Sequence, residues 1–476
     1  MLLLDSARRD RLTISPRRAA FYCGAVASLD EALRARGAAL VVRRGAAAAT
    51  VKRLARQARA RTVVWAAEYD AAAVGRQRAL QAELEEAGLR ALIVHDAPVV
   101  QPEDLAAARS ADGGEGYRAF VPYVNAWKEA VRAPFDTRVG LDTAGLESEA
   151  LPTAAEFGAE ALANAGSEAR DARSGTADAS SEASDAPPAS AGARSEAAAP
   201  SETLAMAELE AFIAGPVLHY LTARYVPAEA TSCLSAHLSF GTLSARTVLA
   251  RIDARGRDRF LLTEERLSLE AFRRSLALRD FFLQLAWYFE AQPDQALQER
   301  MRHFPFAPEH PALAAWKAGR TGYPLVDAGI RELIATGRMH PRARAVAASF
   351  LCFDLGVDWR AGRDAWDRLL IEDEPALAGG NWQWIAGVGA DLAQFPRIYN
   401  PRKQARTLDP RATYVRRWIP ELAALPGAPG ARARAGDGQL ALPLFSAAVY
   451  PAPVVDHEEA AREYLRRYVE FVATPR

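Results

Sequence analysis

A run of three acidic residues and a pair of arginines are the groups in this sequence best suited to bind a charged ligand. Glu372, Asp373 and Glu374 are consecutive, and Arg342 and Arg344 stand two positions apart earlier in the chain. The arginines fall in the first turn of an expected helix that has an apolar side. Because a guanidinium packed against a core needs an acidic partner, the sequence predicts that they pair with carboxylates. The alternative is that the three acids form a solvated loop.

Two tryptophans, Trp359 and Trp382, could carry electrons. An indole is easily oxidised, and closely packed indoles allow an electron vacancy to move from one ring to the next. Large aromatic side chains also fill protein cores, and for any single tryptophan that packing role is the alternative. Which role applies depends on how close the rings lie in the fold.

Two further stretches carry groups that bind phosphate. Thr231, Ser232 and Ser235 supply hydroxyls at the start of an expected helix, whose first N–H groups can hold a phosphate. The alternative there is an ordinary Ser/Thr helix cap. Residues 397–411 carry five basic side chains against one acid, Asp409. That strip could neutralise the phosphates of a nucleic acid, or it could be a solvated loop.

Composition narrows the class of protein. The 476 residues are enough for two or three domains, and the formal net charge of zero means that any nucleic-acid site is a local patch. The widely spaced Cys23, Cys233 and Cys352 support neither a disulfide framework nor a metal site. No apolar run reaches the roughly 20 residues of a membrane span, and Met1 opens no signal peptide. We expect a monomeric, cytoplasmic protein.

The pattern of elements divides the chain into two domains and a linker. Residues 1–135 alternate short apolar runs with helical segments, which is typical of a parallel sheet with crossover helices. The predicted strands are 2–4, 39–42, 62–65 and 92–94, and the predicted helices are 15–36, 47–60 and 71–87. Residues 136–203 are dominated by small, polar and acidic residues, which predicts a disordered linker. Residues 204–476 predict a mainly α-helical domain, so the fold class is α/β followed by α-helical.

One helix boundary can be predicted closely. A helix should end at Gly337, which suits a left-handed C-cap, and the next should begin at Pro341, where a first-turn proline is tolerated. The first of these helices should bury a set of apolar residues on one side: Leu325, Val326, Ile330, Leu333 and Ile334.

Several motifs occur together in the C-terminal part. They are TSCLSAHLSFGTLSAR at 231–246, TGYPLVDAGIREL, TGRMHPRAR, ASFLCFDLGVDWR, NWQW, FPRIYNP and YVRRWIPEL. In this order they resemble the flavin domain of the DNA photolyase/cryptochrome family, from about Leu204 to the end of the chain. The three cysteines are too few for the four-cysteine iron–sulfur branch of that family.

The resemblance implies FAD as the cofactor and assigns roles residue by residue. The implied FAD-binding residues are Tyr220, Thr231, Ser232, Leu234, Ser235, Arg279, Arg344, Glu372, Glu374 and Ala378. The implied electron-transfer residues are Trp382 and Trp359, and the implied DNA-binding residues are Arg342, Arg397 and Gln404. Within the FAD set, one of the two glutamates is expected to pair with Arg344.

The sequence also departs from the family pattern. Leu2–Asp5 resembles the second strand of the family's N-terminal domain, so the first strand and helix are expected to be missing, which puts an antenna chromophore in doubt. Ser275 and Leu278 stand where dimer-repairing members carry glutamate and tryptophan. Ala378 replaces the residue that faces flavin N5. Phe306 replaces the third tryptophan of the electron-transfer chain, for which Trp316, Trp384 or Tyr323 could substitute.

The resemblance implies light-driven repair of pyrimidine dimers in DNA by electron transfer from excited, reduced FAD. The alternative is a cryptochrome-like blue-light sensor or redox flavoprotein without repair activity. Ser275, Leu278, Ala378 and Phe306 favour the alternative, because each lacks a group that repair or photoreduction uses. Trp382, Trp359 and the loop that carries the hydroxyls of Thr231, Ser232 and Ser235, here called the hydroxyl loop, argue against a protein that has lost both activities.

Overall fold

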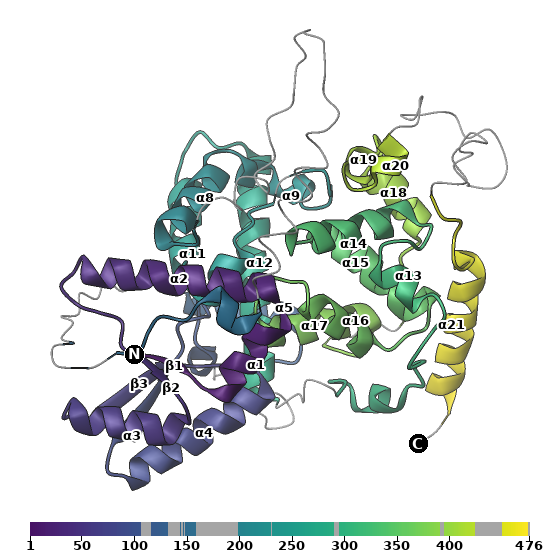
Figure 1. Cartoon of the computed structure of the whole chain (residues 1–476). Helices are drawn as coiled ribbons and strands as arrows, with labels where there is room; N and C mark the ends of the chain where they lie inside the picture. Colours follow the sequence, from purple (N-terminus) through teal and green to yellow (C-terminus); the bar gives the residue numbers. More distant parts are fainter. Residues whose placement is uncertain are drawn as a thin grey trace, which may run out of the picture.

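An α/β part at the N-terminus and a larger helical part make up the fold (Figure 1). The computed structural model describes residues 1–105, 116–131, 143, 146, 148–158, 199–229, 231–289, 295–390, 395–423 and 450–474. Most of the predicted linker, residues 159–198, lies outside these residues. The fold class predicted from the sequence is confirmed.

The N-terminal part alternates strands and helices as predicted. Its elements are β1 (Leu2–Leu4), α1 (Ser6–Ile14), α2 (Pro16–Arg34), β2 (Val42–Arg44), α3 (Ala47–Gln57), β3 (Thr62–Ala66), α4 (Ala71–Glu86), β4 (Arg90–Val94) and η1 (Pro102–Leu105). β1 pairs with β2 and β3 with β4, both parallel, in two separate two-stranded sheets within the described residues. The strands lie between α2 on one side and α3 and α4 on the other (Figure 1).

Two details of this part differ from the sequence prediction. The strand expected at 39–42 is assigned three residues later, at β2, although Leu40 and Val41 are buried beside it. Residues 148–158, predicted to belong to the linker, pack along β2: the N–H of Glu149 donates to the carbonyl of Val42 at 3.1 Å. Phe157, in the short helix η2 (Ala154–Phe157), is buried against the same layer. A few apolar residues within a polar stretch are enough to anchor it.

The rest of the described chain is helical. After α5 (Phe120–Ala130) come α8 (Glu202–Ala214), η3 (Pro216–His219), α9 (Tyr220–Ala223), α10 (Ser235–Phe240), α11 (Ala245–Gly256), α12 (Thr263–Tyr288), η4 (Glu299–His303), α13 (Leu313–Lys317), α14 (Pro324–Thr336), α15 (Pro341–Ser349), the π-helix η5 (Phe350–Asp354), α16 (Trp359–Asp367), α17 (Pro375–Ala386), α18 (Pro401–Leu408), α19 (Thr413–Trp418), α20 (Pro420–Ala423) and α21 (His457–Ala473).

The predicted break between α14 and α15 is confirmed. Gly337 has φ 69°, the left-handed conformation that glycine adopts without strain, and Pro341 is the first residue of α15. Four of the five apolar residues expected on the inner side of α14 are buried, but Ile334 is 40 % exposed. Ile334 lies in the last turn of α14.

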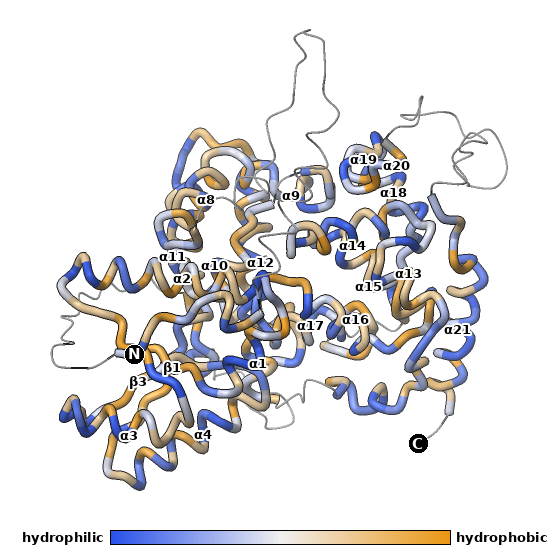
Figure 2. The backbone as a smooth tube through the Cα atoms, viewed as in Figure 1, coloured by the Kyte–Doolittle hydropathy of each residue, from blue (hydrophilic) through white to orange (hydrophobic). Residues whose placement is uncertain are grey.

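Two helical cores hold this part together. One surrounds α12, with α5 and α8 against it, and the other surrounds α14, α15 and α16. α21 closes the second core: Tyr464 packs edge-on against Phe353 at 4.7 Å between ring centroids, and Tyr323 donates a hydrogen bond to the carbonyl of Val455. Along α4 and α21, hydrophilic and hydrophobic stretches alternate, as in helices with one buried side (Figure 2).

Among the described residues, no single helix has both the length and the apolar composition of a membrane span. The bent pair Glu202–Ala214 and Pro216–Ala223 meets the requirement by length and composition, and its buried residues pack in the core around α12.

Candidate functional site

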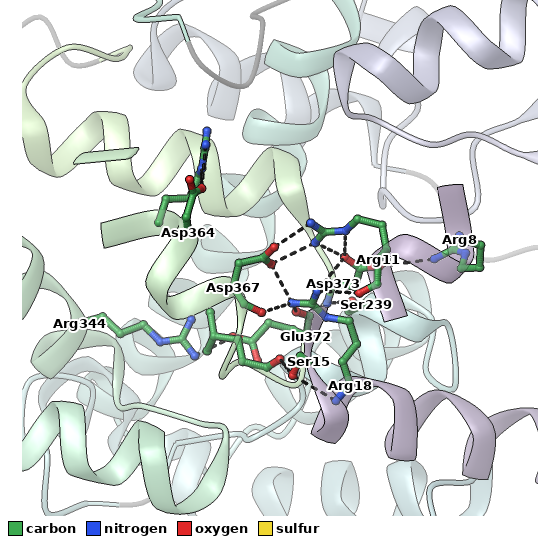
Figure 3. A network of polar contacts seen from close by, with 12 residues as sticks. Arg8, Arg11, Ser15, Arg18, Ser239, Arg344, Asp364, Asp367, Glu372 and Asp373 are labelled. Atoms are coloured by element: carbon green, nitrogen blue, oxygen red, sulfur yellow. Dashed lines mark hydrogen bonds and ion pairs between the residues drawn. The ribbon is translucent and has the colours of Figure 1, made fainter. Parts of the chain in front are cut away.

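Each acid of the triplet has its own guanidinium partner. Oε1 of Glu372 lies 2.6 Å from Nη2 of Arg344, so the ion pair expected for Arg344 forms. Oε1 of Glu374 lies 2.6 Å from Nη2 of Arg279, on α12. Asp373, between them, accepts a hydrogen bond from Nε of Arg11 at 2.9 Å. The partners of the outer acids come from the helical part and that of the middle acid from α1. Figure 3 shows Arg344 beside Glu372 and Arg11 beside Asp373.

Arg279 is held on several sides. Its guanidinium is only 7 % exposed and donates to the carbonyls of Ala97 and Leu238 as well as to Glu374. Burial raises the pKa of Glu374, although the charge of Arg279 opposes that shift. Arg279 therefore links α12 to Glu374 and, through the carbonyl of Ala97, to the residues that follow β4.

The start of α17 leaves room for a ligand. A Cβ at Gly379 would meet no atom within 4 Å, whereas a Cβ at Gly380 would lie 2.2 Å from the ring of Phe282. Gly380 thus allows α17 to pack tightly on α12, and Gly379 borders open space. Beside them, Oε2 of Glu372 is buried without a hydrogen-bond partner. A buried carboxylate oxygen without a partner indicates a missing donor, such as a ligand hydroxyl. Ala378, in the same turn, offers no polar group of its own.

The hydroxyl loop turns sharply and leaves two of its hydroxyls accessible. Cys233 adopts φ 55°, in the left-handed region, and its carbonyl accepts a hydrogen bond from Arg338 at 2.7 Å. Leu234 is buried below the loop, while Ser232 and Ser235 remain accessible and their hydroxyls have no partner in the described residues. α10 is too short to act as an anion site by itself, so the hydroxyls and the turn would carry the binding.

Tyr220 joins this loop region to α12. Its hydroxyl lies 3.1 Å from Oγ of Ser275, which in turn bonds the carbonyl of Ala271. Burial raises the pKa of Tyr220, so it stays a neutral phenol at physiological pH. Leu278, one turn further along α12, is half-buried against the same core.

These features fit FAD. An accessible hydroxyl loop suits its diphosphate, an unpartnered carboxylate oxygen suits its ribityl hydroxyls, and the open side of α17 suits a flat ring. The residues implied from the sequence for the FAD site therefore fall in two groups, one on the loop and one around α17.

The two tryptophans expected to transfer electrons, Trp382 and Trp359, are both buried but have different neighbours. Trp382 is buried, and its ring centroid is 4.5 Å from that of Trp366 and 6.5 Å from that of Trp316. Trp359 is also fully buried, but the groups that lie over its ring are the guanidiniums of Arg360 and Arg363. Within the described residues, no ring contact joins Trp359 to Trp382. The nearest indoles to Trp382 are thus Trp366 and Trp316.

The residues expected to bind DNA lie on neighbouring segments. The guanidinium of Arg342 sits 4.6 Å above the ring of Tyr225 and 5.8 Å from that of Tyr399. Arg397 is exposed two residues before Tyr399, and Gln404 lies half-buried on α18. Two tyrosine faces hold the charge of Arg342 in place while leaving it able to meet an anion.

His340 lies next to these groups and immediately precedes α15. Its Nδ1 accepts a hydrogen bond from the N–H of Arg342, which makes it the helix cap. Burial lowers the pKa of His340 to about 4, with Arg342 and Arg344 adding to the shift. The ring is therefore neutral at physiological pH.

Sequence reasoning missed three sets of residues here. It did not select Trp366, although Trp359 and Trp366 are seven residues apart and so share one side of α16. It left Asp373 without a partner. It also gave no role to Arg11 or Arg18, because nothing in the N-terminal pattern indicates contact with residues more than 300 positions later.

Comparison with known proteins bears on both parts of the chain. Residues 2–139 match the family model described as DNA photolyase, and residues 272–470 match the one described as FAD binding domain of DNA photolyase. The deoxyribodipyrimidine photo-lyase of Halobacterium salinarum is 31 % identical over 95 % of this chain and 88 % of its own length.

Solved structures agree with the sequence relatives. A bacterial class III photolyase from Agrobacterium tumefaciens superposes with a TM-score of 0.75 at 28 % identity, over 97 % of this chain and 90 % of its own. A cryptochrome from Synechocystis superposes with a TM-score of 0.76 at 26 % identity, over 95 % of this chain and 88 % of its own. With an α/β domain, a helical FAD-binding domain and a relative matched over nearly the whole of both, this chain belongs to the DNA photolyase family.

Proposed function

We propose that this protein is a deoxyribodipyrimidine photo-lyase that repairs pyrimidine dimers in DNA with light and reduced FAD. The observation that carries the proposal is the match to a relative of that name over 95 % of the chain, through both the α/β and the FAD-binding parts. Similarity over only the FAD-binding part would have supported the cofactor alone.

The residues around α17 take defined roles in this proposal. Arg344 with Glu372, and Arg279 with Glu374, hold the ribityl chain and ring of FAD, and Ala378 lines the ring. Tyr220, Thr231, Ser232, Leu234 and Ser235 hold the diphosphate. The chemistry that bound, reduced FAD supplies is light-driven donation of one electron to the dimer. Support comes from the unpartnered Oε2 of Glu372 and the accessible hydroxyls of the loop.

Trp382 and Trp359 are proposed to return electrons to the cofactor site. Both rings are buried, and Trp382 lies in α17, the helix that carries the acidic segment into the site. Trp366 and Trp316, which contact Trp382, add two further indoles that could take part in the transfer.

DNA is the proposed partner. Arg342, Arg397 and Gln404 would contact its backbone, since guanidinium groups pair with phosphate oxygens in a planar, two-bonded geometry. The tyrosine faces around Arg342 support this role because they orient a charge that has no carboxylate partner in the described residues. The expectations of a monomeric and cytoplasmic protein stay predictions.

A second function is a blue-light sensor, and one observation favours it. Ser275 stands where a dimer-binding glutamate was expected, and its hydroxyl is already engaged by Tyr220 and Ala271. A hydroxyl has a single proton, and Ser275 already donates it to the carbonyl of Ala271, so it has no donor left for a lesion. The likeness to a cryptochrome structure agrees with this alternative.

Repair of an oligonucleotide that carries one cyclobutane thymine dimer separates the two functions. The protein is loaded with FAD, reduced chemically so that internal electron transfer is not needed, and illuminated with blue light. Restored thymines in the light and none in the dark would support the photo-lyase. Full FAD occupancy without repair would overturn it in favour of the sensor, and a Ser275→Glu/Leu278→Trp variant would then test whether those two residues account for the missing activity.

A further inference from the structure

Three arginines from the N-terminal helices converge on the segment that carries the FAD-site glutamates (Figure 3). Arg8 and Arg11 lie in α1, and Arg18 in α2. They meet Asp367, at the end of α16, and Asp373. We call these five residues the arginine clamp. Its two sides are about 350 positions apart in the sequence.

The clamp is built from several charge-assisted hydrogen bonds. Arg11 donates from Nη1 to Oδ2 of Asp367 at 2.8 Å and from Nη2 to Oδ1 at 3.0 Å, the paired geometry that a guanidinium offers a carboxylate. Its Nε reaches Asp373 at 2.9 Å. Arg8 approaches Asp373 from the other side at 3.5 Å. The side chain of Asp373 is only 6 % exposed, so these bonds are largely shielded from solvent.

Arg18 fixes the backbone as well as the side chains. It is fully buried, and its Nη2 donates to Oδ1 of Asp367 at 2.8 Å, to the carbonyl of Asp367 at 2.9 Å and to the carbonyl of Glu372 at 3.1 Å. Nε of Arg18 is buried without a partner, so the bonds of its two Nη atoms have to offset the cost of burying the charge, and the backbone carbonyls that accept them are held in place. One of them belongs to Glu372, whose side chain pairs with Arg344.

The place of Asp373 between Glu372 and Glu374 allows the clamp to position both glutamates. The three acids turn to different partners: Glu372 pairs with Arg344, Glu374 pairs with Arg279, and Asp373, between them, is bonded by Arg11. Asp373 is the member that the clamp holds, and its N–H also donates to Oγ of Ser239 at 2.8 Å. Fixing Asp373 therefore fixes the register in which both glutamates meet their arginines.

We propose that the arginine clamp positions Glu372 and Glu374 for FAD, so that α1 and α2 of the N-terminal part determine how tightly the helical part binds the cofactor. Arg11, Arg18 and Asp373 are positioning residues in this account and do not touch FAD themselves. The inference rests on the placement of FAD around Glu372 and Glu374 proposed above, but not on repair activity.

The test is the affinity of the apoprotein for FAD, measured in the dark by quenching of flavin fluorescence. Asp373→Asn keeps the shape of the side chain and removes its charge, and Arg11→Lys keeps a charge but loses the fork that spans two carboxylates. Each is expected to weaken FAD binding about tenfold, since each loses charge-assisted bonds that hold the segment. Arg11 is the milder site because its side chain is 31 % exposed.

Two matched variants separate positioning from general damage. Arg34→Gln, on the same helix as Arg18, removes an ion pair with the buried Asp30 but does not touch the clamp, so it should leave the FAD affinity of the folded protein unchanged whatever it does to stability. Val26→Ala, in the core of α2, should lower the melting temperature but leave the FAD dissociation constant unchanged at a temperature where it is folded. A clamp that only stabilised the fold would make Arg11→Lys behave like Val26→Ala.

Hydrogen exchange supplies a readout that needs no cofactor. In the apoprotein, the amides of residues 371–374 should exchange faster in Asp373→Asn than in the wild type, while those of α14 stay protected. Wild-type FAD affinity in folded Asp373→Asn and Arg11→Lys would overturn the inference. If Glu372→Gln and Glu374→Gln also bound FAD normally, the proposed placement of the cofactor would fall with it; if those two variants bound weakly, the clamp alone would be wrong.

Discussion

Trp366 packs its ring against Trp382, with 4.5 Å between the ring centroids and 54° between the planes. The same Trp366 stacks on Trp316 at 5.8 Å and 14°. Gly362 makes this approach possible, because a Cβ there would lie 2.2 Å from the Trp382 ring. Three indoles therefore form one continuous cluster beside α17.

Replacing Trp366 with phenylalanine should lower the yield of light-driven FAD reduction. The change keeps an aromatic ring in the cluster but removes an easily oxidised indole next to Trp382. The measurement is the decrease of flavin absorbance under blue light with a thiol as external reductant. Trp359→Phe is the comparison. A larger drop in yield in that variant than in Trp366→Phe would show that Trp359, and not Trp366, carries most of the electron transfer.

The two adjacent glycines of α17 should respond in opposite ways to alanine. Gly380→Ala should destabilise the apoprotein by about 1–3 kcal/mol, because the new methyl group overlaps Phe282. Gly379→Ala should stabilise it by up to about 1 kcal/mol through helix propensity, since nothing lies within 4 Å. Thermal unfolding of the apoprotein measures both changes.

The same pair of variants locates the cofactor. If the open side of Gly379 belongs to the FAD site, Gly379→Ala should weaken FAD binding while leaving the apoprotein intact. Unchanged affinity in that variant would place the ring away from this turn of α17.

A buried histidine–aspartate pair should make stability depend on pH. Nδ1 of His457 lies 2.5 Å from Oδ1 of Asp354. Burial alone would lower the pKa of His457, but Asp354 raises it above its ordinary value. Burial raises the pKa of Asp354 to about 6. Both groups therefore hold protons more tightly in the folded protein than in the unfolded chain, so the stability that they contribute falls as pH rises.

The comparison that isolates this effect is the wild type against His457→Gln. The wild type should be more stable by about 3 kcal/mol at pH values above the Asp354 pKa of about 6 and below the raised pKa of His457, because the variant leaves the ionised Asp354 buried without its charged partner. That difference should shrink as pH rises through and beyond the pKa of His457 in the folded state. A difference that stayed constant or grew would mean that the pair is not protonated as described.

Arg342 should contribute to DNA binding in a salt-dependent way. Arg342→Ala should weaken binding of duplex DNA and reduce the slope of log affinity against log salt by about 0.9, the change expected when the protein neutralises one phosphate fewer. Fluorescence anisotropy over a range of salt concentrations measures the slope. Arg466→Gln is the control, because that guanidinium is held by Glu463 and Glu470 on α21. An unchanged slope for Arg342→Ala would remove Arg342 from the DNA surface.

The sequence was most informative where local chemistry decides the structure. Gly337 and Pro341 marked a helix boundary to the residue, because a left-handed cap and a first-turn proline are properties of single residues. The ion pair of Arg344 with Glu372 followed from a resemblance in motifs. Helical period alone placed Ile334 on the buried side, but the structure leaves it 40 % exposed.

The rest depends on contacts between segments far apart in the chain. Glu374 was expected near the cofactor, but its partner Arg279 is 95 residues earlier. Trp366 came into the indole cluster through the packing of α16 on α17. Asp373 looked like a spare acid between two others, and only the docking of α1 gives it a partner. Hydrophobic period and motif order carry no information on such contacts.

The position of α21 has a consequence for how the protein is made. Tyr323 caps α14 and donates its hydroxyl to Val455, 132 residues later, and His457 donates its own N–H back to that hydroxyl. During synthesis, the helices around α14 leave the ribosome long before the segment that covers them. Until the chain has grown past His457, the side of these helices that the later segment covers stays exposed. Nascent chains stalled before that point should therefore be the ones that chaperones bind most strongly.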